Sequence, residues 1–441
     1  MPVKKVYIET YGCQMNEYDT ELVRAVLLKE NYQLVDHESD ADIVMLNTCS
    51  VRDTANRKVY NRLHTLRRLR NGKPMLIGVL GCMASNYRQS LLENKNFHID
   101  FVIGPDSYKR LPQILQQVQS TGQKAYDVTL SEFEVYADVY PQRKGGVNAW
   151  IAVMRGCNNF CTFCVVPYTR GRERSRSPKN ILEEVKQLVT EGFQQVTLLG
   201  QNVNSYHYRG KDFAYLLEKV SEVDGIERIR FTSPHPKDFP HQLLHVVAEN
   251  PKVCKHIHLP LQAGNNRILE LMNRTYTREE YIALVNEIRD HYPAMVLTTD
   301  IIVGFPGETD QEFMDTYQVM EQVQFDSAFI FKYSERKGTM AARRFRDDVS
   351  EAKKTERIMT LNQLQNSISL KKNQAHLGEI HKVLIEEEST KKSSQQVQGR
   401  NDGNKIVILP KGHLKRGDFV EVLITDATPH VLRGEIVKSV E

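Results

Sequence analysis

Six of the seven cysteines fall into two groups whose spacing indicates iron–sulfur chemistry. Cys157, Cys161 and Cys164 form one group, in the motif Cys-x3-Cys-x2-Cys. Three thiolates on one short loop are soft ligands that can hold three irons of a 4Fe–4S cluster. The fourth iron would have no protein ligand and would be open to a substrate or cofactor. A zinc knuckle is the alternative, but structural zinc sites prefer four ligands in paired Cys-x2–4-Cys units.

The second group is dispersed over the first ninety residues. Cys13, Cys49 and Cys82 each follow a predicted apolar strand, in the segments TYGC, LNTC and LGC. Ligands of open α/β sheets bind outside the carboxyl ends of the strands, so three such positions predict convergence on one site. We interpret them as the ligands of a second three-cysteine cluster, with three structural core cysteines as the alternative. Cys254 has no partner in either pattern, and we expect it to be structural.

Alternating strands and helices must position both groups. Residues 1–120 alternate apolar strands with helices, which predicts an N-terminal open parallel α/β sheet covered on both faces. Residues 121–147 are polar and lack periodicity, so we expect a linker. Residues 148–374 contain six strand–helix units and a charged helical connector, which predicts a partial (βα)6 TIM-like barrel. Residues 375–441 carry short β-branched runs between turn residues, which is typical of a small antiparallel β-barrel.

Composition and charge narrow the class of protein. The chain has 441 residues, 40% of them hydrophobic, and no window approaches the roughly 18 consecutive apolar residues of a membrane span. The odd cysteine count and the absence of an apolar leader favour a reducing compartment, so we expect a cytoplasmic protein with no membrane association.

Basic residues are concentrated locally although the net charge is only +4. The range 52–73 holds eight basic residues and one acid, and the run RGRERSR follows the cysteine motif directly. Such patches suit a polyanion such as RNA, whereas solvated helix faces are the alternative. Arginine can pair with phosphates bidentately, so the run supplies candidate RNA-binding residues. These are Arg170, Arg172, Arg174 and Arg176, some of which could instead pair with barrel carboxylates or a cofactor.

The segment GCNNFCTFC resembles the signature of the radical S-adenosylmethionine superfamily. That resemblance implies that the methionyl group binds the open iron and that reductive cleavage yields a 5′-deoxyadenosyl radical, which abstracts hydrogen from an unreactive C–H bond. The segments TLLGQNVN, FTSPHP, HLPLQAGN and IIVGFPGET also match. The resemblance places four residues near the cofactor, with ordinary turn residues as the alternative: Gln201, Ser233, Gln262 and Gly304.

The whole layout is similar to the radical-SAM methylthiotransferase family, which combines a dispersed-cysteine domain, a radical-SAM domain and a TRAM domain. The resemblance implies two 4Fe–4S clusters and S-adenosylmethionine, with sulfur handled at Cys13, Cys49 and Cys82. It also implies a tRNA anticodon stem-loop as substrate, an electron donor such as a flavodoxin or ferredoxin, and a sulfur source.

Within the family, NTCSVRDTA and GQNVNSY look most like members that methylthiolate C2 of N6-isopentenyladenosine at tRNA position 37. The alternatives are N6-threonylcarbamoyladenosine in tRNA and a ribosomal-protein aspartate, because those members share the cysteine pattern. A binding protein with structural clusters is a different class, but structural clusters normally have four protein ligands.

Overall fold

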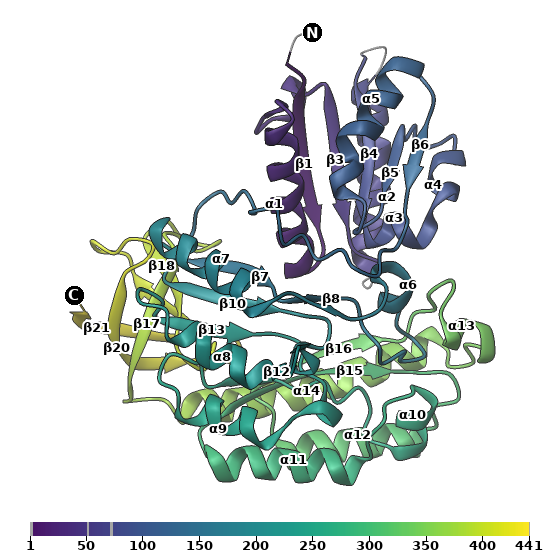
Figure 1. Cartoon of the computed structure of the whole chain (residues 1–441). Coiled ribbons are helices and arrows are strands. Elements are labelled where there is room, and N and C mark those ends of the chain that lie inside the picture. Colours follow the sequence, from purple (N-terminus) through teal and green to yellow (C-terminus); the bar gives the residue numbers. More distant parts are fainter. Residues whose placement is uncertain (1–2, 51–52, 71–73, 441) are drawn as a thin grey trace.

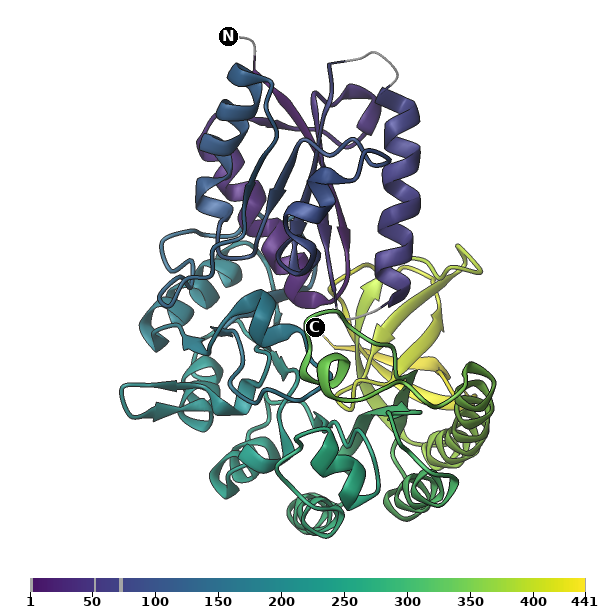
Figure 2. The same ribbon diagram turned by 90° about the vertical axis from the view of Figure 1, so that its right-hand side faces the viewer.

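The computed structural model describes residues 3–50, 53–70 and 74–440, with the side chains of residues 53–55 and 438–440 left aside. An N-terminal domain lies above a central barrel, and a smaller C-terminal barrel lies beside the central one (Figure 1). The view in Figure 2 preserves this arrangement and shows helix α2 along the outside of the N-terminal sheet.

The N-terminal domain is a parallel six-stranded sheet with strand order β2-β1-β3-β4-β5-β6, which confirms the predicted open α/β sheet. Its central strands are apolar runs buried on both faces, as helices on each side of a parallel sheet require. The strands are β1 (Lys5–Tyr11), β2 (Gln33–Leu34), β3 (Ile43–Thr48), β4 (Leu76–Gly81), β5 (Phe101–Ile103) and β6 (Ala125–Asp127). The helices are α1 (Gln14–Lys29), α2 (Asp53–Arg70), α3 (Cys82–Tyr87), α4 (Gln89–Glu93) and α5 (Leu111–Thr121).

The linker begins later than the sequence predicts. Ala125 pairs with Phe101, so β6 extends the sheet from within the segment 121–147. An edge strand exposes one side to solvent, which explains why this short polar segment carries no strand-like pattern.

The central barrel contains six parallel strands, as predicted. Two three-stranded sheets, β13-β10-β7 and β14-β15-β16, are joined by a parallel bridge between Ile229 and Val253. Strands β7 and β16 are therefore the two edges of an incomplete barrel. The strands are β7 (Asn148–Ala152), β10 (Gln195–Leu199), β13 (Arg228–Phe231), β14 (His256–His258), β15 (Val296–Val303) and β16 (Ser327–Lys332).

Helices surround the central barrel and bury their apolar faces against the strands in one large core. They include α7 (Pro178–Thr190), α8 (Phe213–Ser221), α9 (His241–Glu249), α11 (Arg278–His291), α12 (Asp310–Val323) and α14 (Glu351–Gln374). None of the helices in the described part of the chain has both the length and the apolar character that crossing a membrane requires.

The C-terminal domain is a closed barrel of five strands in the order β17-β18-β19-β21-β20. Its pairs are antiparallel as predicted, except that β19 and β21 run parallel. The strands are β17 (Ile380–Glu387), β18 (Gln396–Arg400), β19 (Ile406–Pro410), β20 (Phe419–Ala427) and β21 (Leu432–Val440). The small barrel is attached by Arg228 and Arg230, whose guanidinium groups donate to the carbonyls of Arg400 (2.7 Å) and Asn401 (2.8 Å).

Candidate iron–sulfur site

The three dispersed cysteines lie at the ends of three adjacent parallel strands. Cys13 caps α1 after β1, Cys49 follows β3, and Cys82 opens α3 directly after β4. These strand ends point towards the central barrel (Figure 1). The turn is tight, because a Cβ added at Gly12 would come within 2.5 Å of the Cys49 Cβ. The sheet topology therefore brings the three residues to one place, as the sequence predicts.

Electrostatics at this group favour the anionic form of the Cys13 sulfur. A hydrogen bond with Cys49 and the nearby Arg170 guanidinium lower the pKa of the Cys13 thiol to about 6, against the effect of burial. Burial raises the pKa of Cys82, but the Nε of Arg170 donates to its Sγ at 3.1 Å. Cysteine binds metal as thiolate, and a buried cation beside it stabilises that form. The donor set fits an anionic cluster with three protein ligands.

The second group lies on the loop between β8 (Met154–Arg155) and α6 (Val166–Arg170). The backbone folds tightly, and the amide of Cys164 donates to the carbonyl of Cys161 at 2.9 Å. Burial is the main reason that the pKa of Cys157 is raised to about 11, and the charges of Glu173 and Cys161 contribute to the same rise. Arg274 Nη1 donates to Cys161 Sγ at 3.3 Å. Three sulfurs with one buried cation again fit a three-ligand cluster.

The four residues that the sequence predicts near the cofactor all follow strands of the central barrel. Gln201 follows β10, Ser233 follows β13, Gln262 follows β14 and Gly304 follows β15. Three of them have positive φ angles: 59° at Ser233, 70° at Gln262 and 70° at Gly304. Strained backbone in side-chain-bearing residues is costly and concentrates at functional sites.

Buried polar atoms without a hydrogen-bond partner among the described residues lie at the same end of the barrel. These atoms are Gln201 Oε1, Asn202 Oδ1 and His235 Nε2. Burial and the nearby Arg274 lower the pKa of His235 to about 2, so its ring is neutral. Its Nδ1 accepts from the Lys237 amide, which places the proton on Nε2. Two acceptors and one donor suit the polar groups of a methionyl cofactor.

Sequence reasoning missed Asn202, which follows the predicted Gln201, and two further residues at this site. His235 stands in the segment FTSPHP, where only Ser233 was singled out, and Arg274 belongs to no motif. A histidine four residues after the end of β13, and two after Ser233, is the available signal for His235.

A cavity of about 1030 Å³ runs through the inside of the central barrel. Alternate residues of the strands face inwards, so polar groups such as Arg230, His258 and Asp300 share the wall with Trp150 and Phe329. The lining also includes Cys13, Ser233 and residues of the C-terminal barrel, among them Arg416 and His430. One dispersed cysteine, Cys13, and one residue of the cofactor end, Ser233, therefore line the same cavity.

Three of the four arginines expected to bind RNA are buried instead. Arg170 pairs with Asp19 at 2.7 Å, Arg174 with Asp106 at 3.0 Å, and Arg176 with Glu184 at 2.7 Å. Asp19 and Asp106 belong to the N-terminal domain, so the first two pairs join that domain to the barrel. A guanidinium held in this way cannot reach an RNA phosphate, and the RNA interpretation does not hold for these three residues.

Arg172 is the exception in the run. Its side chain is exposed, and the guanidinium lies 4.4 Å from the centre of the Phe160 ring, on the cysteine loop. A cation on an aromatic face can still present its donors to a phosphate.

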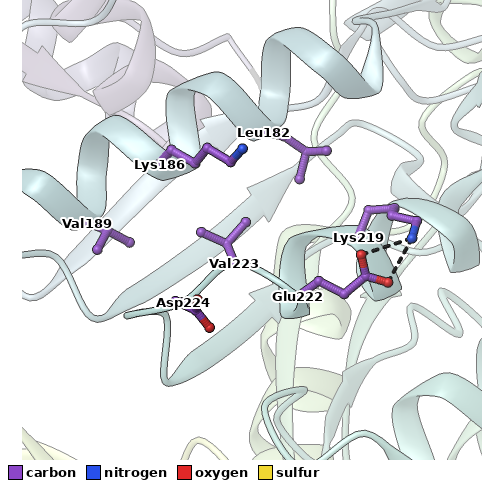
Figure 3. A pocket seen from close by; sticks show the side chains of 7 residues that line it. All are labelled: Leu182, Lys186, Val189, Lys219, Glu222, Val223 and Asp224. Carbon is purple, nitrogen blue, oxygen red and sulfur yellow. Dashed lines mark hydrogen bonds and ion pairs between the residues drawn. The ribbon is translucent and has the colours of Figure 1, made fainter.

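A separate pocket of about 420 Å³ lies between α7 and α8 on the outside of the barrel (Figure 3). Leu182, Val189 and Val223 line it together with Lys219, which is paired with Glu222 at 2.8 Å. Neither cysteine group nor the unpartnered polar atoms contribute to this pocket, so it is not part of the candidate site.

Three known domains match successive parts of the chain. Residues 5–104 match "Uncharacterized protein family UPF0004", residues 151–320 match the Radical SAM superfamily, and residues 374–437 match the TRAM domain. The chain is 46% identical over 444 residues to a protein of Bacteroides thetaiotaomicron, covering 98% of this chain and 96% of the relative. It is 47% identical over 433 residues to a protein of Chloroherpeton thalassium, covering 98% and 95%. Both relatives are named tRNA-2-methylthio-N(6)-dimethylallyladenosine synthase.

Solved structures support the fold alone. The radical S-adenosylmethionine methyltransferase TsrM of Kitasatospora setae superposes with a TM-score of 0.58 at 15% identity, covering 74% of this chain and 72% of TsrM. The cobalamin-dependent radical enzyme OxsB superposes with a TM-score of 0.52 at 13% identity, covering 81% and 56%. With its domain order and its near full-length relatives, the chain belongs to the radical-SAM methylthiotransferases, in the branch named tRNA-2-methylthio-N(6)-dimethylallyladenosine synthase.

Proposed function

We propose that this enzyme methylthiolates C2 of N6-isopentenyladenosine at position 37 of tRNA, next to the anticodon. The observation that carries the proposal is a cavity lined by one residue from the dispersed cysteine group and one from the cofactor end of the barrel. Cys13 of the dispersed group and Ser233 at the cofactor end line the same cavity of about 1030 Å³. The name shared by the relatives favours isopentenyladenosine over threonylcarbamoyladenosine and over a ribosomal-protein aspartate.

The chain offers a separate set of residues for each bound group. Cys157, Cys161 and Cys164 would hold the cluster at which S-adenosylmethionine binds, and Cys13, Cys49 and Cys82 would hold the auxiliary cluster. When bound, one S-adenosylmethionine would supply a carbon radical able to remove the C2 hydrogen, the auxiliary cluster would supply sulfur, and a second S-adenosylmethionine would supply the methyl group. The adenine C2–H is not acidic, so a general base alone would not activate it.

Three side chains that follow barrel strands would bind the methionyl group of the cofactor. Gln201 and Asn202 offer unpartnered acceptors to the methionyl ammonium, and His235 offers an Nε2 donor to its carboxylate. The strained backbone at Ser233 and Gln262 turns the chain sharply at these strand ends. Burial keeps the His235 ring neutral, with its pKa lowered to about 2, so this group would act as a hydrogen-bond donor and not as an acid at neutral pH.

The substrate base would reach the cavity through the open side of the central barrel. Trp150 lies on edge strand β7 and Phe329 on edge strand β16, and both line the cavity. Phe329 is 52% exposed, which is a large fraction for an aromatic residue on a barrel strand. Bases stack on exposed aromatic rings in single-stranded RNA recognition, and an anticodon loop presents its bases in that form.

The remaining RNA contacts would come from charged residues around this opening. Arg416 and His430 of the C-terminal barrel are exposed and line the cavity, and Arg172 is exposed beside the cysteine loop. The reaction also needs an external electron donor, for which a flavodoxin or ferredoxin is suitable, and a source of replacement sulfur. These requirements are consistent with a cytoplasmic enzyme.

Mass spectrometry of tRNA nucleosides tests the proposal. Cells that lack the gene should accumulate N6-isopentenyladenosine and lose its 2-methylthio derivative. Expression of the intact chain should restore the derivative, whereas a chain with Cys13, Cys49 and Cys82 replaced by Ala should not. Loss of 2-methylthio-N6-threonylcarbamoyladenosine with unchanged isopentenyl derivatives would assign the enzyme to the other tRNA substrate. If cells that lack the gene have unchanged tRNA nucleosides but a ribosomal protein without its methylthio group, the substrate would be the ribosomal-protein aspartate.

A further inference from the structure

Arg170 reaches across the domain boundary to a cysteine of the dispersed group. It ends α6 in the central barrel domain, and α6 packs against α3, which begins with Cys82. Its Nε donates to Cys82 Sγ at 3.1 Å, and its Nη2 donates to Asp19 Oδ2 at 2.7 Å. The side chain is only 3% exposed.

The surrounding residues fix the orientation of this guanidinium. The other oxygen of Asp19 accepts from Arg155 Nη2 at 2.5 Å, and the Arg155 guanidinium lies 4.7 Å from the centre of the Tyr136 ring. Asp19 is therefore held on both sides, and Arg170 cannot rotate without breaking two charge-assisted hydrogen bonds. The sulfur contact is a consequence of this arrangement and does not depend on a mobile side chain.

One donor of Arg170 is left over. Its Nη1 is buried and has no hydrogen-bond partner among the described residues. A buried unpaired N–H is costly, and native proteins rarely leave one without a purpose. A bound cluster would present bridging sulfides to the same region as the Cys82 sulfur, and these can accept from this donor.

Hydrogen bonds to cluster sulfur and nearby positive charge both stabilise the electron-rich reduced state. They are therefore among the factors that set the reduction potential of an iron–sulfur centre. Arginine is always charged, so its effect is constant across the physiological pH range. Arg274 has the same relationship to Cys161 at the other site, but it comes from the same domain as that cysteine.

We propose that Arg170 is a positioning residue of the auxiliary cluster, which raises the reduction potential of that cluster through its own contact with Cys82 across the domain boundary. This inference rests on the proposed assignment of Cys13, Cys49 and Cys82 as cluster ligands. It gives the central barrel domain a direct influence on the electronic state of a cluster that the N-terminal domain carries.

The potential can be measured in a full-length parent chain with Cys157, Cys161 and Cys164 replaced by Ala, so that only the auxiliary cluster gives a signal. We expect Arg170→Gln to lower the ratio of reduced to oxidised cluster about tenfold at a fixed potential, a shift of about 59 mV for a one-electron couple. Arg170→Lys keeps a charge without the planar fork of donors, so it should recover part of the shift.

Arg174→Gln is the matched control. Arg174 is buried at the same domain boundary, but it pairs with Asp106 and contacts no cysteine. The control should leave the potential unchanged. An unchanged potential in Arg170→Gln with full iron content would overturn the inference, as would an equal shift in Arg174→Gln.

A second measurement does not require the Arg170→Gln variant. In the parent chain labelled with 15N-arginine, the reduced cluster should show a nitrogen hyperfine coupling in pulsed electron paramagnetic resonance, and Arg170→Lys should abolish it. Absence of coupling in an iron-loaded parent would overturn the role of Arg170 even if Arg170→Gln fails to fold. A parent chain that binds no iron would instead overturn the auxiliary cluster itself, so the two failures are distinguishable.

Discussion

Asp19 and Arg155 form an ion pair that is completely buried between the N-terminal domain and the central barrel, with Nη2 2.5 Å from Oδ1. Because Arg170 pairs with the same carboxylate, two guanidinium groups face one acid. A buried charge network contributes little net stability, but removing one partner costs much more, because the remaining charges stay buried without a counter-ion. The excess positive charge at this boundary is matched when a cysteine sulfur is ionised or bound to iron.

Asp19→Asn should therefore loosen the docking of the two domains. Leaving two buried guanidinium groups without their counter-ion should cost about 3–5 kcal/mol and lower the first thermal unfolding midpoint. Arg155 and Arg170 hold the pKa of the Asp19 carboxyl below its usual value despite burial. Its stabilisation is then present above about pH 4 and is lost as the pH falls further.

Calorimetry across an acid pH series measures both effects. Asp138→Asn is the control, because Asp138 is 71% exposed in its pair with Lys109 and should change the midpoint little. An Asp19→Asn protein with the parent midpoint and acid profile would show that the domains do not depend on this pair.

Replacing Cys157, Cys161 and Cys164 with Ala should halve the iron content, from about eight to about four per chain, if each site holds one 4Fe–4S cluster. Reductive cleavage of S-adenosylmethionine should be abolished, because the iron site that would bind it is lost. Iron analysis and chromatography of the cleavage products are the measurements. A variant that retains all its iron would contradict the assignment of this motif.

Replacing Cys13, Cys49 and Cys82 with Ala should separate sulfur insertion from radical generation. The other cysteine loop lies on a different domain, so cleavage of S-adenosylmethionine should continue while methylthiolated tRNA disappears. Anaerobic assays of both products on one preparation test this expectation. The idea of an auxiliary sulfur site fails if the variant still makes the full product.

Arg172→Gln should weaken tRNA binding in a salt-dependent way. Each phosphate contact contributes about 0.7–0.9 to the slope of log affinity against log salt, so loss of one contact should make the slope shallower by about that amount. Arg174→Gln should lower stability without changing the slope, because its guanidinium is buried against Asp106. Binding titrations at several salt concentrations distinguish the two, and equal slopes for Arg172→Gln and the parent would exclude a phosphate contact.

Phe329→Ala should raise the apparent KM for tRNA without affecting cofactor cleavage in the absence of RNA. Stacking of a base on an aromatic ring contributes about 1–3 kcal/mol, which corresponds to about a 5- to 150-fold change. Phe329→Tyr retains the ring and should restore most of the affinity. A parent-like KM in Phe329→Ala would place the base elsewhere in the cavity.

The placement of the cysteines could be predicted from the sequence because it follows from topology. Each dispersed cysteine ends a recognisable apolar strand, and parallel strands bring their carboxyl ends to one edge. The six units of the central barrel could be recognised for the same reason, since each strand and helix has its own periodicity. Local sequence patterns were sufficient to predict these features because each of them depends on where single strands and helices begin and end.

The fate of the arginine run could not be predicted in this way. Arg170 pairs with Asp19, 151 residues away, and Arg174 pairs with Asp106, 68 residues away. Basic residues in sequence look alike whether they face solvent or a buried carboxylate on another domain. His235 was missed for a similar reason, because its burial and its unpartnered nitrogen arise from packing around the barrel.

The gap between β7 and β16 has a consequence for the kind of molecule that this enzyme can modify. A closed barrel can be entered only from its two ends. A slot along the side admits one unit of a polymer while the chain continues past on both sides, with no need to thread a terminus. The central barrel has two strand–helix units fewer than a closed barrel. The side between β7 and β16 can therefore admit one nucleotide from the middle of a long nucleic acid.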